Sequence, residues 1–89
     1  MRHARDEDLD RLEDLLAGLR VLPGLTEKKR GVFYRGSRAF LHFHEDSAGL
    51  FADIRDGAGR DFDRIDVTHP GGRARLLEAA RARLTRGGA

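Results

Sequence analysis

The sequence predicts an α+β fold of one small domain, with two helices on one face of an antiparallel sheet of three to four strands. Three observations lead to this prediction. The 89 residues are too few for a second domain. Leucines recur at helical spacing near both ends, and aromatic-rich runs separated by glycine turns fill the middle. The expected element order is α-β-β-β-β-α, and because each helix has a single apolar stripe, the other sheet face is left open.

An N-terminal helix is expected over residues 5–20. Its leucines follow a period of about 3.6 residues and form one apolar stripe. Three acidic residues at positions 6–8 fall in the first turn, where the helix dipole favours negative charge. Pro23 and Gly24 then end the segment with a turn.

Strands are expected over residues 32–35, 38–44 and 50–55. A two-residue turn at positions 36 and 37 predicts the pairs Tyr34–Ala39, Phe33–Phe40 and Val32–Leu41. A loop of about four residues within the turn-like stretch 45–49 predicts the pairs Phe43–Leu50, Leu41–Ala52 and His42–Phe51. Because paired residues share a face, both hairpins give the same partition. The face expected to line the core carries Val32, Tyr34, Ala39, Leu41, Phe43, Leu50, Ala52 and Ile54. The open face is expected to carry Phe33, Arg35, Arg38, Phe40, His42, His44, Phe51 and Asp53.

The last two expected elements are an edge strand over 62–67 and a helix over 70–85. Ile65 and Val67 are expected to point inward, while polar neighbours protect the edge. Pro70 suits the first turn of the helix. Its predicted apolar stripe is Leu76, Leu77, Ala80 and Leu84.

Composition excludes several classes of function. The chain has no cysteine, which excludes disulfides, thiolate catalysis and cysteine-based zinc sites. No apolar run approaches the roughly 18 residues of a membrane span. Charged residues make up 36% of the chain. We therefore expect a cytoplasmic protein with no membrane partner.

Charges are segregated along the sequence. Acidic residues dominate positions 1–19 and 45–66, and basic residues dominate positions 20–44 and 67–89. The blocks either pair with each other across the fold or leave a basic patch for a polyanion. The candidate polyanion-binding residues are Lys28, Lys29, Arg30, Arg35 and Arg38, expected at one end of the first hairpin. Nucleic acid is therefore one alternative ligand.

A metal site is a second alternative. His42 and His44 lie two positions apart on one strand, so their imidazoles point to the same side. Asp53, expected diagonal to His42, could supply the carboxylate of a two-histidine, one-carboxylate site. His3 and His69 are expected to lie elsewhere.

The leading interpretation is a non-enzymatic binding module that uses its open sheet face. Three phenylalanines there would leave an apolar patch of the kind that marks interfaces, so a homodimer or another protein partner is expected. The binding residues would be Phe33, Phe40, His42, His44, Phe51 and Asp53. No catalytic residues and no cofactor are predicted. The one candidate acid–base pair on the open face is His42 beside Asp53, and no further group completes a catalytic site around it.

The stretch LPGLTEKKRGVFYRGSRAFLHFHEDSAGLFADIR, residues 22–55, resembles a group of small bacterial proteins and is distantly similar to the MmcQ/YjbR family. In that family a Leu-Pro-Gly turn also precedes a hairpin with a glycine at its tip. Phe33, Gly36, Ala39 and Phe40 match its strand pattern. The resemblance implies an α/β sandwich and a DNA-binding role, and it implies no catalytic residue.

Overall fold

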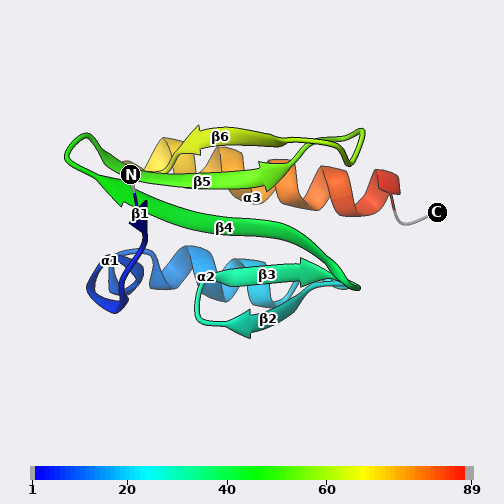
Figure 1. Cartoon of the computed structure of the whole chain (residues 1–89), viewed down its shortest axis with the longest axis horizontal. Coiled ribbons are helices and arrows are strands. Elements are labelled where there is room, and N and C mark those ends of the chain that lie inside the picture. Colours follow the sequence, from blue (N-terminus) through cyan, green and yellow to red (C-terminus); the bar gives the residue numbers. More distant parts are fainter. Residues whose placement is uncertain (1, 88–89) are drawn as a thin grey trace.

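The computed structural model describes residues 2–87, with side chains for residues 2–85, and it confirms the α+β class. An antiparallel sheet forms one layer, and helices cover one of its faces (Figure 1). The sheet has six strands, more than the sequence predicts. The elements are β1 (Arg2–His3), α1 (Asp6–Asp10), α2 (Glu13–Arg20), β2 (Thr26–Lys29), β3 (Val32–Arg35), β4 (Arg38–Asp46), β5 (Gly49–Arg55), β6 (Phe62–Asp66) and α3 (Pro70–Gly87).

The N-terminal leucine-rich segment, expected as one helix, forms two. Leu12 leaves the helical conformation, with φ −108° and ψ 12°, while its side chain stays buried. Arg11 donates to the Asp8 carboxylate at 2.9 Å across the end of α1. The break allows Leu9 of α1 and Leu16 of α2 both to reach the core.

The two helices α2 and α3 lie side by side behind the sheet, as expected (Figure 1). They approach closely at Gly18, where a Cβ would lie 3.2 Å from Leu77 Cδ2 of α3. Helix α3 begins at Pro70, as predicted, and three residues of its apolar stripe are buried. These are Leu76, Ala80 and Leu84.

The strand order is β2-β3-β4-β5-β6, with β1 paired to β4. β5 pairs along one edge of β4, so β1 and β3 share its other edge: β3 pairs with the first half of β4, and β1 pairs with residues near its end. The sequence did not indicate β1 or β2. The first has only two residues and the second reads TEKK, so neither shows an alternating apolar pattern.

The first hairpin has the predicted turn but a different register beyond it. Tyr34 pairs with Ala39 as expected, but an irregularity then brings Phe33 opposite Leu41. Because this changes the offset by one residue, the side chains of β3 switch faces. Phe33 is 1% exposed and lies in the core, whereas Val32, expected inside, pairs with His42 on the open face. Phe40, at the irregularity, is also buried, at 4% exposure. The expected positions of Phe33 and Phe40 on the open face are therefore wrong.

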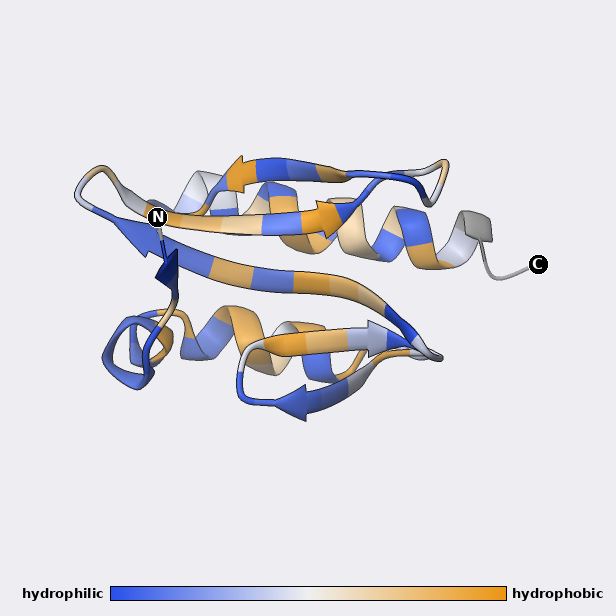
Figure 2. Cartoon of the chain, viewed as in Figure 1, coloured by the Kyte–Doolittle hydropathy of each residue, from blue (hydrophilic) through white to orange (hydrophobic). Residues whose placement is uncertain are grey.

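The second hairpin is tighter than predicted. Asp46 pairs with Gly49 across a two-residue turn, so every pair along β5 is shifted by two positions. A shift of two keeps each side chain on its face. Ala52 and Ile54 are accordingly buried as expected. In Figure 2, hydrophobic and hydrophilic residues alternate in the middle of β4, after a continuous hydrophobic stretch near its start. The cross-strand partners do change: Phe51 lies opposite His44, and Asp53 lies opposite His42.

The core fills the space between the sheet and the helices. Val67, just after β6, is fully buried and Ile65 packs against the core, as predicted. The buried hydrophobic residues are Leu9, Leu12, Leu15, Leu16, Leu19, Leu22, Phe33, Phe40, Leu41, Phe43, Leu50, Ala52, Ile54, Val67, Leu76, Ala80 and Leu84.

Candidate functional site: a histidine cluster and an arginine pocket

Three histidines meet on the open face of the sheet. His42 and His44 share this face, as predicted from their spacing on β4. His3 joins them because β1 pairs with β4 in a register that places His3 opposite His44. The expectation that His3 lies elsewhere is therefore wrong. His69 directly precedes α3 and is not part of the cluster.

The three imidazole rings are in mutual contact. His42 Nδ1 and His44 Nε2 are 2.9 Å apart. The rings of His3 and His44 are stacked, with centroids 4.9 Å apart. One potential ligand nitrogen from each of the three side chains lies within 4.8 Å of the other two. Imidazole nitrogens grouped in this way can bind one divalent transition-metal ion.

Asp53 borders the cluster but is held by an arginine. Its two oxygens accept hydrogen bonds from Arg64 at 2.8 and 2.9 Å, and Oδ2 lies 3.1 Å from His44 Nε2. The Arg64 bonds hold the pKa of Asp53 below its usual value. Burial lowers the pKa of both His42 and His44. At neutral pH the site therefore combines the neutral imidazoles of His42 and His44 with an ionised, arginine-bound carboxylate.

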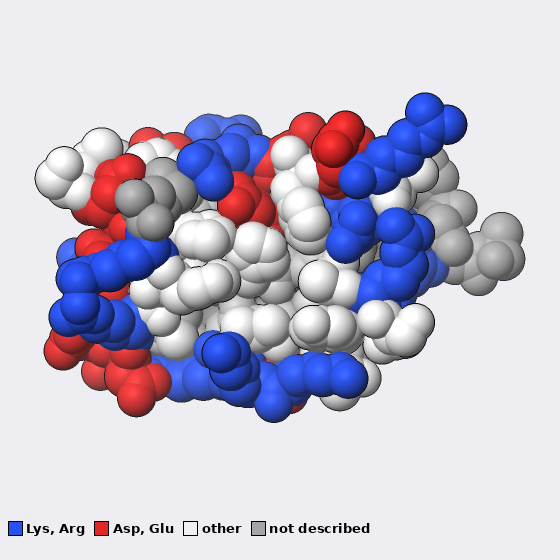
Figure 3. Space-filling model, viewed as in Figure 1, with Lys and Arg blue, Asp and Glu red and all other residues white. Residues whose placement is uncertain are grey.

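The apolar part of the open face is smaller than the sequence predicts. Of the three expected phenylalanines, only Phe51 lies there, half-buried. Phe62 of β6 is an unexpected addition, 38% exposed, with its ring 5.0 Å from that of His42. Figure 3 shows uncharged atoms in the middle of this face and basic residues along parts of its border. Association of two copies through this face stays a prediction.

The predicted basic cluster is divided between the two ends of β3. Lys29 and Arg30 lie at the β2–β3 turn, whereas Arg35 and Arg38 flank the β3–β4 turn. The expectation of a single cluster is wrong, because the chain runs the length of β3 between them. Arg30 is neutralised by carboxylates of the N-terminal helical region, at 2.9 Å from both Asp10 and Glu13. Lys28 lies over the ring of Tyr34, 4.8 Å from its centroid.

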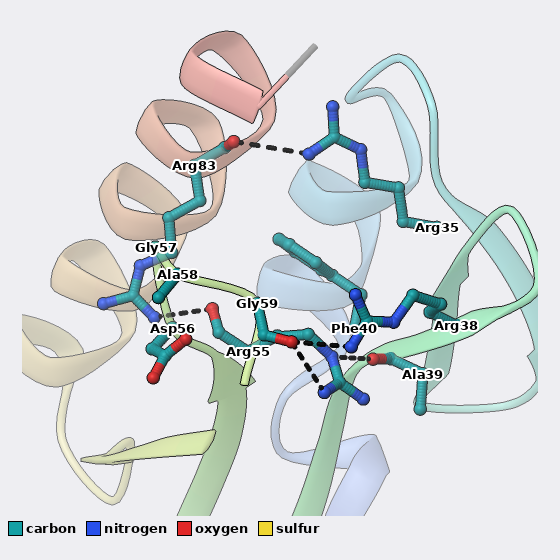
Figure 4. A pocket seen from close by; sticks show the side chains of 10 residues that line it. All are labelled: Arg35, Arg38, Ala39, Phe40, Arg55, Asp56, Gly57, Ala58, Gly59 and Arg83. Carbon is teal, nitrogen blue, oxygen red and sulfur yellow. Dashed lines mark hydrogen bonds between the residues drawn. The ribbon is translucent and has the colours of Figure 1, made fainter. Parts of the chain in front are cut away.

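A pocket of about 210 Å³ lies at the β3–β4 end of the sheet. Four arginines from four different elements line it: Arg35 of β3, Arg38 of β4, Arg55 of β5 and Arg83 of α3. Figure 4 shows these side chains around Phe40 and the loop of residues 56–59.

Backbone oxygens hold the arginines in place. Arg38 Nη2 donates to Gly59 O at 2.6 Å, and Arg55 Nε donates to Ala39 O at 2.7 Å. Arg35 donates to carbonyls of the last turns of α3, a favourable position because the helix dipole is negative there. Each guanidinium has five N–H donors, so these bonds leave donors available to a ligand.

The acidic residue of the pocket is engaged with its own loop. Asp56 accepts hydrogen bonds from the backbone N–H groups of Arg60 and Asp61, at 3.0 and 3.3 Å. These backbone bonds, from Arg60 first, lower the pKa of Asp56. The carboxylate therefore stabilises the turn and does not form an ion pair with a pocket arginine among the described residues.

Arg55, Arg83 and His3 are candidate residues that sequence reasoning missed. A signal for Arg55 was present: in an antiparallel hairpin the end of β5 lies beside the start of β4, next to Arg38. Arg83 comes from the distant helix α3, and its position depends on how α3 packs on the sheet. No local pattern indicates it.

No protein-family model, no curated protein and no solved structure matches the chain. The similarity to the MmcQ/YjbR family therefore stays a prediction. Among the described residues, no helix is long and apolar enough to cross a membrane.

Proposed function

We propose that the chain is a binding domain rather than an enzyme, and that its ligand is a small phosphate-bearing anion held in the arginine pocket. The observation that carries the proposal is the convergence of four arginines on one cavity. Guanidinium groups match phosphate oxygens in charge and in the spacing of their donors.

The pairing of charges elsewhere in the molecule supports this choice. Arg20 and Arg30 are satisfied by carboxylates from the N-terminal helices and β2. Across the described side chains, Arg35, Arg38 and Arg55 form no ion pair, and Arg83 pairs with Asp63 at 2.9 Å. The three guanidinium groups of Arg35, Arg38 and Arg55, which form no ion pair with the described side chains, repel each other, and a bound anion relieves that repulsion.

The size of the pocket favours a compact ligand. Its 210 Å³ lies below the roughly 300–1,000 Å³ that is usual for drug-sized molecules. An inorganic phosphate, or the terminal phosphate of a larger molecule, suits this volume and the donors around it. The loop of residues 56–59 closes one side of the pocket and is held by Arg38 and Arg55 through Gly59.

The test is an amide NMR titration with inorganic phosphate at low salt. We expect shifts in residues 35–40 and 55–59. Arg38→Gln should weaken binding by roughly 10–150-fold, because a charge-assisted hydrogen bond contributes roughly 1.5–3 kcal/mol. Arg60→Gln is the matched control: it removes the same charge next to the loop but outside the pocket lining. Equal effects of the two variants, or no shifts with phosphate, would overturn the proposal.

A single-stranded oligonucleotide serves as the second probe, because nucleic acid carries the same phosphate chemistry. If phosphate binds only in the arginine pocket, the oligonucleotide should shift only the amide signals of residues 35–40 and 55–59. Shifts that extend to Lys28 and Lys29 and weaken steeply with salt would replace the small anion with nucleic acid as the ligand.

A further inference from the structure

The histidine cluster, made of His3, His42 and His44, lies outside the arginine pocket and offers imidazole nitrogens instead of guanidinium groups. Its members come from two strands that are far apart in sequence: His3 from β1, and His42 and His44 from β4. The pairing of β1 with β4 brings them together, so an intact cluster requires the folded sheet.

Hydrogen bonding within the protein leaves the cluster incompletely satisfied. His44 Nδ1 is buried and has no hydrogen-bond partner in the described structure. Such groups are uncommon in folded proteins, since an unpaired buried polar atom costs about 1–3 kcal/mol. The close pair formed by His42 Nδ1 and His44 Nε2, 2.9 Å apart, requires one ring to donate a proton to the other or to share it. A cation bound to ring lone pairs would satisfy nitrogens that the protein leaves without partners.

We propose that His3, His42 and His44 together bind one divalent transition-metal ion of the zinc type. Three nitrogens within 4.8 Å of one another can contract around one ion by small rotations of the side chains. Three histidines plus an open position is an established ligand set for zinc, and imidazole also suits copper and nickel. The exposure of His3 gives the ion a route from solvent.

Asp53 acts in this proposal as a positioning residue and not as a ligand. Its carboxylate is fixed by the two bonds from Arg64 and lies 3.1 Å from His44 Nε2. A carboxylate that accepts the N–H of one ring nitrogen orients a histidine whose other nitrogen binds the metal, here Nδ1 of His44, and increases its basicity. The sequence pattern pointed to Asp53 as a third ligand, whereas the structure provides His3 in its place.

The ring of Phe62 covers one side of the cluster, 5.0 Å from the ring of His42. Apolar cover of this kind limits the access of water to a metal and strengthens the bonds of its ligands. The guanidinium of Arg55 lies over the Phe62 ring, 4.4 Å from its centroid, and helps to keep it in place.

The experiment is a titration of the full chain, without a polyhistidine tag, with Co²⁺ and separately with Zn²⁺. Visible absorption reports the coordination of Co²⁺, and calorimetry gives the affinity and stoichiometry for Zn²⁺. We expect one ion per chain, with a visible spectrum typical of nitrogen-coordinated, four- or five-coordinate cobalt. Absence of binding, or a stoichiometry well above one, would overturn the proposal.

Variants identify the ligands. His3→Gln is the primary variant, because His3 is exposed on a two-residue strand and its loss should leave the core intact. It should lower the Zn²⁺ affinity by at least the roughly 10–100-fold that is typical of changes around a metal. His42→Gln should do the same, and circular dichroism verifies that it folds. His69→Gln is the matched control and should bind as the wild type does. An unchanged affinity in His3→Gln, or an equal loss in His69→Gln, would refute the site.

Discussion

Replacement of Phe33 by alanine should destabilise the fold far more than the same change at Phe62. Phe33 is 1% exposed and pairs with Leu41 in the core, whereas Phe62 on β6 is 38% exposed. Loss of a buried phenylalanine side chain costs about 3–5 kcal/mol, because the lost burial and the cavity both contribute. A domain of 89 residues is stable by roughly 4–13 kcal/mol in all. The Phe33→Ala variant should therefore lose a large fraction of its free energy of unfolding.

Urea unfolding followed by circular dichroism measures the difference in free energy between the variants and the wild type. The Phe62→Ala variant should lose about 1 kcal/mol or less, mainly through its contact with the Arg55 guanidinium. The comparison tests the register of β3 directly. If Phe33→Ala costs less than about 1 kcal/mol, Phe33 is not a core residue and the irregularity in β3 is wrong.

Two further predictions concern the stability of the fold. A Cβ at Gly72 would collide with the carbonyl oxygen of Asp66, so Gly72→Ala should lose about 1–3 kcal/mol. Gly71→Ala should lose little in the same urea assay, because a Cβ there would only make ordinary contact with Arg75 Nη1, at 3.8 Å. The backbone N–H of Arg5 holds the pKa of the buried Asp8 carboxyl below its usual value. Asp8 therefore stabilises the fold above pH ~4, and this contribution is lost as the pH falls through its lower folded pKa. Urea midpoints measured between pH 6 and pH 2 should fall less steeply for Asp8→Asn than for the wild type, and equal slopes would contradict this account.

The faces of β5 and of β4 beyond Phe40 were predictable from sequence, while those of β3 and of Phe40 were not. An error of two residues in the β4–β5 turn leaves the alternation unchanged, so His42, His44 and Asp53 were assigned to the correct side despite wrong partners. The irregularity in β3 shifts the pairing by one residue and reverses Phe33. Such an irregularity depends on how the strand packs, and no residue type in this stretch specifies it.

The candidate sites were predictable only where their residues are close in sequence. His42 and His44 share a strand, and the spacing of two residues is enough to bring them together. His3 and Arg83 reach their sites through long-range contacts, by the pairing of β1 and the packing of α3. The charge pattern was likewise only half informative. It left open whether the acidic and basic blocks pair or leave a basic patch; Arg30 pairs with acidic residues of the N-terminal block, and the sequence did not indicate which arginines would remain without an ion pair.

Arg38 and His44 lie toward opposite ends of β4, so variants near each of them allow one proposed site to test the other, although Arg55 of the pocket contacts Phe62 beside the histidine cluster. Arg38 begins the strand and His44 lies six positions later, which at about 3.3 Å per residue places them roughly 20 Å apart. Effects at sites farther apart than about 7–10 Å usually add without coupling. The double variant Arg38→Gln/His3→Gln should therefore show the phosphate affinity of one single variant and the Zn²⁺ affinity of the other. If His3→Gln alone weakened phosphate binding, the two sites would be coupled, either because the anion contacts the open face or through the contact of Arg55 with Phe62 beside His42.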